Sequence, residues 1–299
     1  MAVLRGSWPA FDLCLGSLIM PTASVYPAGG TTYMPGGGTS THKRALRAEI
    51  QGWAPSSVRR QRNFLYSVQV DQLTGHGYAL TLTMRDTPDG PEALAAVIRA
   101  LMKRFQRAGV IRLHWVIEWQ RRGTPHLHMA VYTPQALPHS GRELVQHWLD
   151  VAGPWGASWG AQDVKPIESA GGWLQYLAKH AARSVKHYQR HGMPDGWTKT
   201  GRLWGHRGDW ATTEPMRFDI DRAGWFRLRR MIRAWRIADA RAEHGTAARA
   251  RRVRQARRML SCADPKLSAV RGTSEWVPED VYLGFLGLLA DQGHQVRQV

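Results

Sequence analysis

The sequence predicts an α+β fold, in which a mainly antiparallel central sheet with helices is followed by a basic helical C-terminal region. Three observations lead to this prediction. A strand–turn–strand pattern occupies residues 114–132, amphipathic helix patterns lie on both sides of it, and arginines are concentrated in residues 221–260. We therefore expect a flexible leader over residues 1–50, an α+β domain over residues 51–215 and a basic helical region over residues 216–299.

The charge of the chain indicates a polyanionic partner. Among 299 residues, Lys and Arg total 41 against 23 Asp and Glu, which gives a net charge of +18. Most of this excess is arginine, whose planar guanidinium pairs well with phosphate. Nucleic acid is the expected partner.

The cysteines and the hydropathy pattern indicate the compartment. Cys14 and Cys262 are far apart and show no metal-ligand spacing, so neither a disulfide framework nor a cysteine zinc site is expected. No apolar run approaches the ~18 residues of a membrane span. We expect a protein of the bacterial cytoplasm, in a reducing compartment and without a membrane partner.

The elements before the central hairpin follow from local patterns. Residues 21–38 are rich in Pro, Gly, Thr and Ser, which favours a flexible leader. Residues 56–70 place arginines opposite apolar side chains and predict a short amphipathic helix, and the alternation in residues 78–84 predicts a strand. Residues 91–108 carry apolar side chains at helical spacing, and Gly109 ends that helix.

The central hairpin is predicted from its turn. Val, Ile, Trp and Tyr dominate both arms, and Arg121–Gly123 lies between them with glycine in the last place. A three-residue loop usually ends in a left-handed residue, which glycine adopts without a steric cost, so Gln120 should pair with Thr124. Counting outward from that pair places Glu118 opposite His126. A loop one residue longer or shorter would move Glu118 to the other face of the sheet.

Side-chain alternation then separates a chemical face from a core face. Glu118, His126 and His128 share one face with Gln120. The core face is expected to carry Trp115, Ile117, Trp119, Leu127, Met129 and Val131. Two imidazoles and a carboxylate suit a divalent cation such as Mg²⁺ or Mn²⁺ that keeps open positions for water or phosphate oxygen. Paired histidines in a strand are also common as ordinary hydrogen-bonded residues, and the residues alone leave both interpretations open.

A second group of polar residues follows on a helix. After an expected helix over residues 142–151 and a strand over residues 163–167, a further helix runs from near Gly172 toward Arg190. Helices packed against one face of the sheet would leave the other face free for a metal and a ligand. Tyr176 and Lys179 are one turn apart on the last helix. Such a pair is often an ordinary surface pair, but it also suits a tyrosine nucleophile with a cation that stabilises its phenolate.

Taken in order, these motifs resemble the HUH-type replication initiators, especially the rolling-circle initiators of filamentous phages and single-stranded-DNA plasmids. The likeness rests on EWQRRGTPHLHM, on YLAK downstream and on GRLWG at residues 201–205, and it covers roughly residues 64–210. The resemblance implies an HUH endonuclease domain over residues 51–215. It further implies Glu118, His126 and His128 as ligands of Mg²⁺ or Mn²⁺, and Tyr176 with Lys179 as the nucleophile motif.

One departure from the family concerns the second tyrosine. His180 stands four residues after Tyr176, where two-tyrosine members have another nucleophile, and Tyr188 lies about 120° round the helix from Tyr176. A one-tyrosine enzyme is expected, in which a second subunit or another nucleophile completes the second strand transfer.

The predicted function is initiation of rolling-circle replication by a metal-dependent single-stranded DNA endonuclease and strand transferase. The resemblance implies attack on single-stranded origin DNA through a 5′-phosphotyrosine intermediate. No Walker-type phosphate loop is present, so helicase and polymerase would come from the host. A relaxase or a single-tyrosine transposase would use the same parts.

The alternative from another class is a non-catalytic DNA-binding regulator. Residues 221–260 are expected to form one or two basic helices that contact phosphate, and this basic region would then be the functional part. The apolar helix pattern over residues 278–290 would pack back on the chain or support an oligomer.

Overall fold

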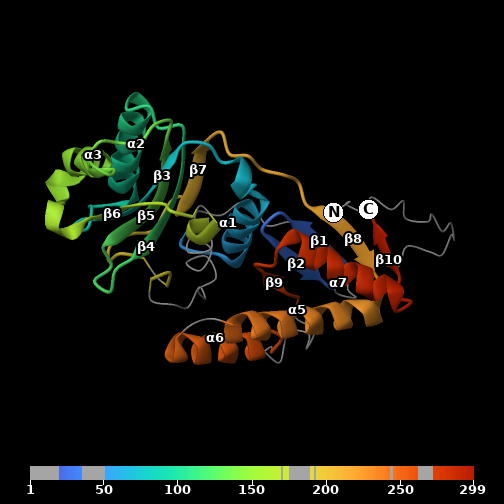
Figure 1. The fold of residues 1–299 in the computed structure, drawn as a ribbon. Coiled ribbons are helices and arrows are strands. Elements are labelled where there is room, and N and C mark those ends of the chain that lie inside the picture. The colour runs from blue at the N-terminus through green and yellow to red at the C-terminus, as the bar shows by residue number, and fades with distance from the viewer. Residues whose placement is uncertain are drawn as a thin grey trace. The chain divides into compact units, whose positions relative to one another are not determined.

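In a computed structural model of the protein, the described residues are 20–35, 51–169, 171–174, 189–191, 193–242, 245–261 and 272–299 (Figure 1). They divide into two compact units. The hairpin unit lies within His42–Thr212, and the terminal unit joins residues from Met1–Thr41 and Thr213–Val299. Among the described residues, no helix combines the length and the apolar character needed to cross a membrane.

The hairpin unit contains a five-stranded antiparallel sheet in the order β6-β3-β5-β4-β7. Its strands are β3 (His76–Thr83), β4 (Arg112–Trp119), β5 (Pro125–Thr133), β6 (Asp163–Pro166) and β7 (Trp204–Gly208). The predicted strands near residues 78–84 and 163–167 and the central hairpin are confirmed. We did not predict β7, because its sequence, WGHRG, consists mainly of glycine and polar residues and shows no apolar alternation.

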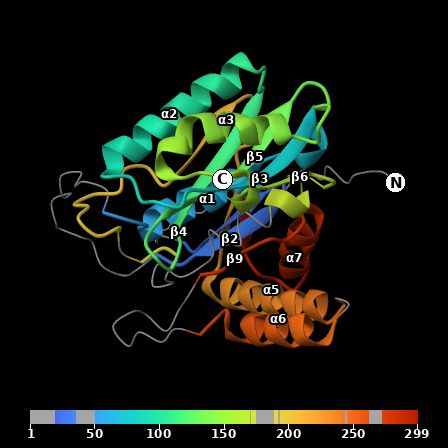
Figure 2. The same cartoon turned by 90° about the vertical axis from the view of Figure 1, so that its left-hand side faces the viewer.

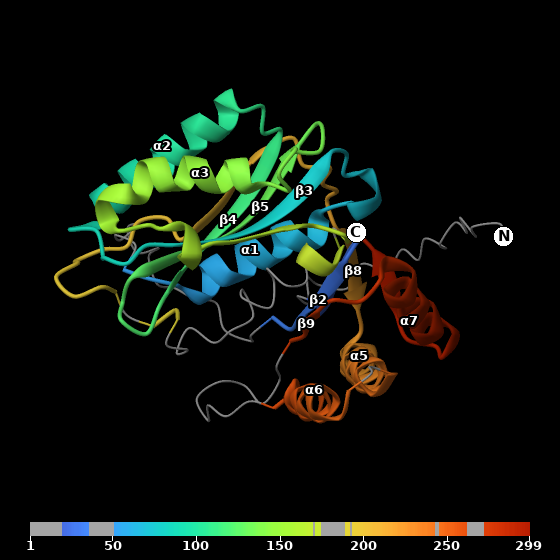
Figure 3. The same ribbon diagram turned by 60° about the vertical axis from the view of Figure 1, so that its left-hand side comes forward.

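Helices cover both faces of this sheet. They are α1 (Pro55–Ser67), α2 (Pro91–Arg107) and α3 (Arg142–Ala152), with short 3₁₀ turns at Val70–Gln72, Gly153–Trp155 and Trp159–Ala161. Figures 2 and 3 show α2 and α3 on one side of the sheet and α1 on the other. The three helices match the predicted ranges, but the expectation of one uncovered face is wrong, because Phe64 of α1 stacks on His114 of β4.

We call the face that carries Thr81, Glu118, His126 and His128 the histidine face. The opposite face is the predicted core face. Its side chains are all buried, and they are Trp115, Ile117, Trp119, Leu127, Met129 and Val131. The long apolar side of α2 packs over them, as the burial of Leu94, Leu101 and Phe105 indicates. This core fixes which side chains of the hairpin face away from it.

The terminal unit has its own antiparallel sheet, in the order β10-β8-β1-β2-β9. Its strands are β1 (Thr22–Tyr26), β2 (Gly29–Tyr33), β8 (Met216–Ile220), β9 (Ser274–Glu275) and β10 (Val296–Gln298). Residues 22–33 therefore pair with strands from the C-terminal part of the chain, and the expectation of a flexible leader is wrong for them.

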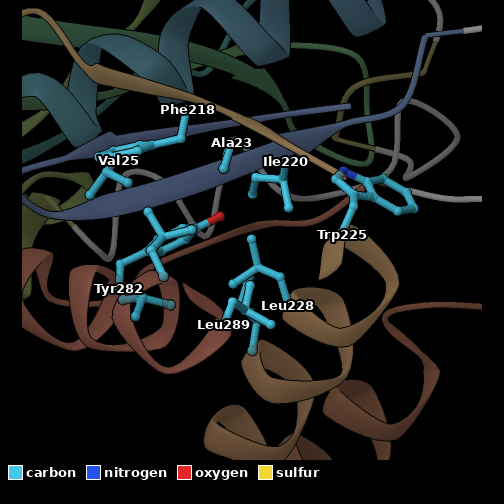
Figure 4. Packing of buried hydrophobic residues seen from close by; sticks show 11 residues of the cluster. Ala23, Val25, Phe218, Ile220, Trp225, Leu228, Tyr282 and Leu289 are labelled. Atoms are coloured by element: carbon cyan, nitrogen blue, oxygen red, sulfur yellow. The ribbon is translucent and has the colours of Figure 1, made fainter. Parts of the chain in front are cut away.

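Three helices complete the terminal unit: α5 (Arg222–Ala242), α6 (Thr246–Arg258) and α7 (Glu279–Asp291). The two helices predicted in residues 221–260 are present, and so is the apolar helix predicted over residues 278–290. Figure 4 shows the core, where Ala23 and Phe218 of the sheet meet Leu228 of α5 and Tyr282 of α7. The apolar helix thus packs back on the unit.

Candidate functional site

The turn of the central hairpin has the conformation that its sequence predicts. The amide of Gln120 donates to the carbonyl of Thr124 at 2.9 Å, and the amide of Gly123 donates to the carbonyl of Gln120 at 2.9 Å. Gly123 has φ 83°, the left-handed conformation that closes a three-residue loop. The predicted loop is confirmed, and with it the register of both arms.

That register brings the predicted ligands together. Glu118 of β4 lies directly opposite His126 of β5, and His128 lies opposite Thr81 of β3. Cross-strand partners point to the same side of a sheet, so these side chains share the histidine face. Glu118 is fully buried, His128 is 4% exposed and His126 is half-buried. The site therefore has a shielded inner part and an accessible rim.

Neighbouring polar groups orient the two imidazoles. The Thr81 hydroxyl lies 3.3 Å from Nδ1 of His128, and the Gln120 amide lies 3.3 Å from Nδ1 of His126. On the other side of the ring, Nε2 of His128 lies 3.8 Å from Oε2 of Glu118. The two imidazole rings are edge to face with centroids 4.6 Å apart. Partners at Nδ1 are the arrangement that fixes a histidine whose Nε2 binds a metal.

The donor set suits a divalent ion. A separation of 3.8 Å between a nitrogen and a carboxylate oxygen is one that two ligands of the same ion can have, since each bond is about 2.0–2.2 Å long. In the part of the chain that the structure describes, no three His, Cys, Asp or Glu side chains are already arranged to hold an ion. The fit of Glu118, His126 and His128 to Mg²⁺ or Mn²⁺ therefore rests on their chemistry and their shared face.

Sequence reasoning missed a buried arginine beside this carboxylate. Nε of Arg190 lies 3.6 Å from Oε1 of Glu118, and neither side chain has any exposed surface. The guanidinium lies over the ring of Trp53, 4.1 Å from its centroid, and the Trp53 indole nitrogen donates to the carbonyl of Ile117 on β4. No local pattern indicates this contact, because Arg190 and Glu118 are far apart in the sequence.

The predicted nucleophile segment is described only at its two ends. Residues 171–174 are helical, as predicted, and Leu174 is fully buried. Tyr176, Lys179 and the alternative Tyr188 lie outside the described residues. At the far end, the carbonyl of Gln189 accepts from the amide of Trp119 at 2.9 Å. The end of the segment is thus fixed to the last residue of β4.

A second histidine pair on the histidine face was also missed. His114 of β4 lies opposite His206 of β7. The Phe64 ring stacks on His206 with centroids 3.8 Å apart and on His114 with centroids 5.8 Å apart. His114 is fully buried, and this burial, with a smaller contribution from His206, lowers the pKa of His114 to about 3. A neutral imidazole in an aromatic stack is a structural group.

Comparisons with known proteins identify relatives along almost the whole chain. A putative replication protein of Xylella fastidiosa strain 9a5c is 44% identical over 290 residues, which cover 93% of this chain and 99% of the relative. A putative replication protein of Xylella fastidiosa strain Temecula1 is 43% identical, with 86% of this chain and 99% of the relative covered.

A phage protein and a family model agree with them. The replication-associated gene 2 protein of Pseudomonas phage Pf3 is 42% identical, with 90% of this chain and 96% of the relative covered. No solved structure matches the chain. The model of the replication-associated protein family of ORF2 and the phage gene 2 protein matches residues 77–184, from β3 through the hairpin to the segment of Tyr176. With relatives this similar over nearly its full length, the chain belongs to this family of replication-associated proteins.

Proposed function

We propose that this protein initiates rolling-circle replication as a site-specific, metal-dependent endonuclease and strand transferase that acts on single-stranded origin DNA. The observation that carries the proposal is the register of the hairpin, which places buried Glu118 opposite His126 and beside His128. The relatives named as replication proteins support the biological role. The net charge of +18 supports a nucleic-acid substrate.

Glu118, His126 and His128 would hold Mg²⁺ or Mn²⁺. When bound, such an ion polarises the scissile phosphate and stabilises the charge that develops on it. The protein's own contribution is orientation, since Thr81 and Gln120 fix the imidazole rings through Nδ1. Burial of Glu118 keeps its carboxylate in one place and excludes water from that side of the site.

Tyr176 is the proposed nucleophile. Its phenolic oxygen attacks the phosphorus, a bond forms between that oxygen and the 5′-phosphate, and the bond from phosphorus to the 3′-oxygen breaks. The phenolic proton is released, the departing 3′-oxygen takes up a proton, and Lys179 stabilises the phenolate. The freed 3′-hydroxyl then primes synthesis by a host polymerase behind a host helicase.

The test is covalent attachment to DNA. Wild-type protein is mixed with end-labelled single-stranded oligonucleotides from candidate origins, and a shifted band on a denaturing gel marks the adduct. Tyr176→Phe removes only the hydroxyl, so it should abolish the adduct and leave DNA binding unchanged. The matched control is Tyr188→Phe, which should form the adduct as the wild type does.

The outcomes separate the competing functions. An undiminished band from Tyr176→Phe would assign the nucleophile elsewhere, with Tyr188 the next candidate. Absence of a band from the wild type on any single-stranded DNA would favour the non-catalytic regulator. Adduct formation on transfer-origin or transposon-end DNA in place of a replication origin would favour a relaxase or a transposase.

A further inference from the structure

The carboxylate of Glu118 has a different neighbour at each oxygen. Oε2 faces Nε2 of His128 at 3.8 Å, whereas Oε1 faces Nε of Arg190 at 3.6 Å. Both Glu118 and Arg190 are fully buried. The carboxylate is therefore oriented with one oxygen toward the imidazole and the other toward the guanidinium.

We propose that Arg190 is a positioning residue for the metal ligand Glu118. A carboxylate that binds a metal through one oxygen is commonly held at its other oxygen by an outer group, and loss of such a group weakens metal binding. Arg190 occupies that outer position, so it turns Oε2 toward the site. This inference rests on the proposed function, because it presupposes that Glu118 binds a divalent ion.

The surroundings of Arg190 explain why an arginine suits the role. Its planar guanidinium lies 4.1 Å from the centroid of the Trp53 ring, and Trp53 is itself tied to the backbone of β4 at Ile117. Stacking holds the plane of the guanidinium, which keeps its edge directed at Glu118. A lysine ammonium would bring the charge but neither the plane nor the stacking.

Arg190 also links the carboxylate to the segment that carries the nucleophile. The residue before it, Gln189, accepts a hydrogen bond from the amide of Trp119, next to Glu118 in β4. Two consecutive residues thus attach the end of the segment after Tyr176 to the strand that supplies the metal ligand. The same side chain would therefore affect both metal affinity and the alignment of the nucleophile.

The experiment compares Arg190→Met and Arg190→Lys with the wild type. Mn²⁺ is titrated into DNA-free protein, and the free ion is followed by electron paramagnetic resonance. We expect Arg190→Met to bind Mn²⁺ about 10- to 100-fold more weakly. Arg190→Lys should recover part of the loss. The matched control is Arg229→Met, which removes another buried arginine that lies over a tryptophan, Trp225, in the terminal unit. It should bind Mn²⁺ as the wild type does.

The readouts distinguish positioning from a purely structural role. Each variant is checked for folding by circular dichroism, and adduct formation is measured across Mn²⁺ concentrations. Positioning predicts that the concentration for half-maximal adduct formation rises in Arg190→Met and rises less in Arg190→Lys. If Arg190→Met does not fold, Arg190→Lys carries the test, because it keeps the charge beside Glu118. Wild-type Mn²⁺ affinity in folded Arg190→Met, or in Arg190→Lys when it carries the test, overturns the inference while leaving the proposed function intact. No Mn²⁺ binding by the wild type would instead overturn the metal assignment itself.

Discussion

Acid should destabilise this protein through one buried imidazole. His114 is fully buried within the aromatic stack, and burial, followed by the nearby His206, lowers its pKa to about 3. In the unfolded chain the same group has a pKa of about 6.5. Between these values the unfolded chain binds a proton that the folded chain excludes, so the free energy of unfolding falls as the pH falls from about 6.5 toward 3.

The size of the effect follows from the two pKa values. At pH 7 the group is nearly neutral in both states, and at pH 5 only the unfolded chain is protonated. The linkage relation gives a loss of about 2 kcal/mol between pH 7 and pH 5 from His114 alone, for a folded pKa of about 3. The pKa of His206 is also lowered, by burial and then by Arg202, so it acts in the same direction.

The assay is urea unfolding followed by tryptophan fluorescence at pH 7 and pH 5. His114→Phe keeps an aromatic ring in the stack but removes the titrating group, so its loss of stability between the two pH values should be about 2 kcal/mol smaller than that of the wild type. Substitution of exposed His76 by Gln serves as the control, because it leaves the buried imidazole in place. Equal losses in wild type and His114→Phe would refute the reasoning.

Three further predictions concern the two units and the metal. A Cβ on Gly30 would lie 2.1 Å from the Tyr282 ring, so Gly30→Ala should destabilise the protein by about 1–3 kcal/mol in thermal unfolding, whereas Gly287→Ala, with open space around it on α7, should be neutral or slightly stabilising. Replacing exposed Arg254 and Arg258 of α6 with Gln should weaken DNA binding and flatten its salt dependence, by up to about 0.7 in the log–log slope per lost phosphate contact on single strands; an unchanged slope would exclude α6 as a phosphate contact. Treatment with EDTA should abolish adduct formation and Mg²⁺ or Mn²⁺ should restore it; full activity after exhaustive chelation would contradict the metal assignment.

The central hairpin was predictable because its information is local. Gly123 fixes the turn, the turn fixes the pairing of Gln120 with Thr124, and strict alternation then determines the faces of Glu118 and His126. The helices of the hairpin unit were predictable for the same reason, since each carries its own apolar period.

What the sequence did not reveal depends on distant partners. Residues 22–33 contain Thr, Gly and Ser, a composition typical of a flexible segment, and they become strands because β8 and β9 provide the pairing. Arg190 has no distinguishing neighbours in the sequence, and its role depends on Glu118 and Trp53. Likewise, α1 shows an amphipathic pattern, but the pattern does not say which face of the sheet it covers.

The strand order of the terminal unit constrains how the chain matures during translation. Its central strand, β1, is among the first described residues to be synthesised, yet its neighbour β8 begins at Met216. At about 5–20 residues per second, a ribosome needs roughly 10–40 s to travel between them. During that interval the hairpin unit can fold, while the isolated pair of β1 and β2 is only marginally stable and has open edges. Newly made protein therefore passes through a stage in which one unit is complete and the other awaits its last strands.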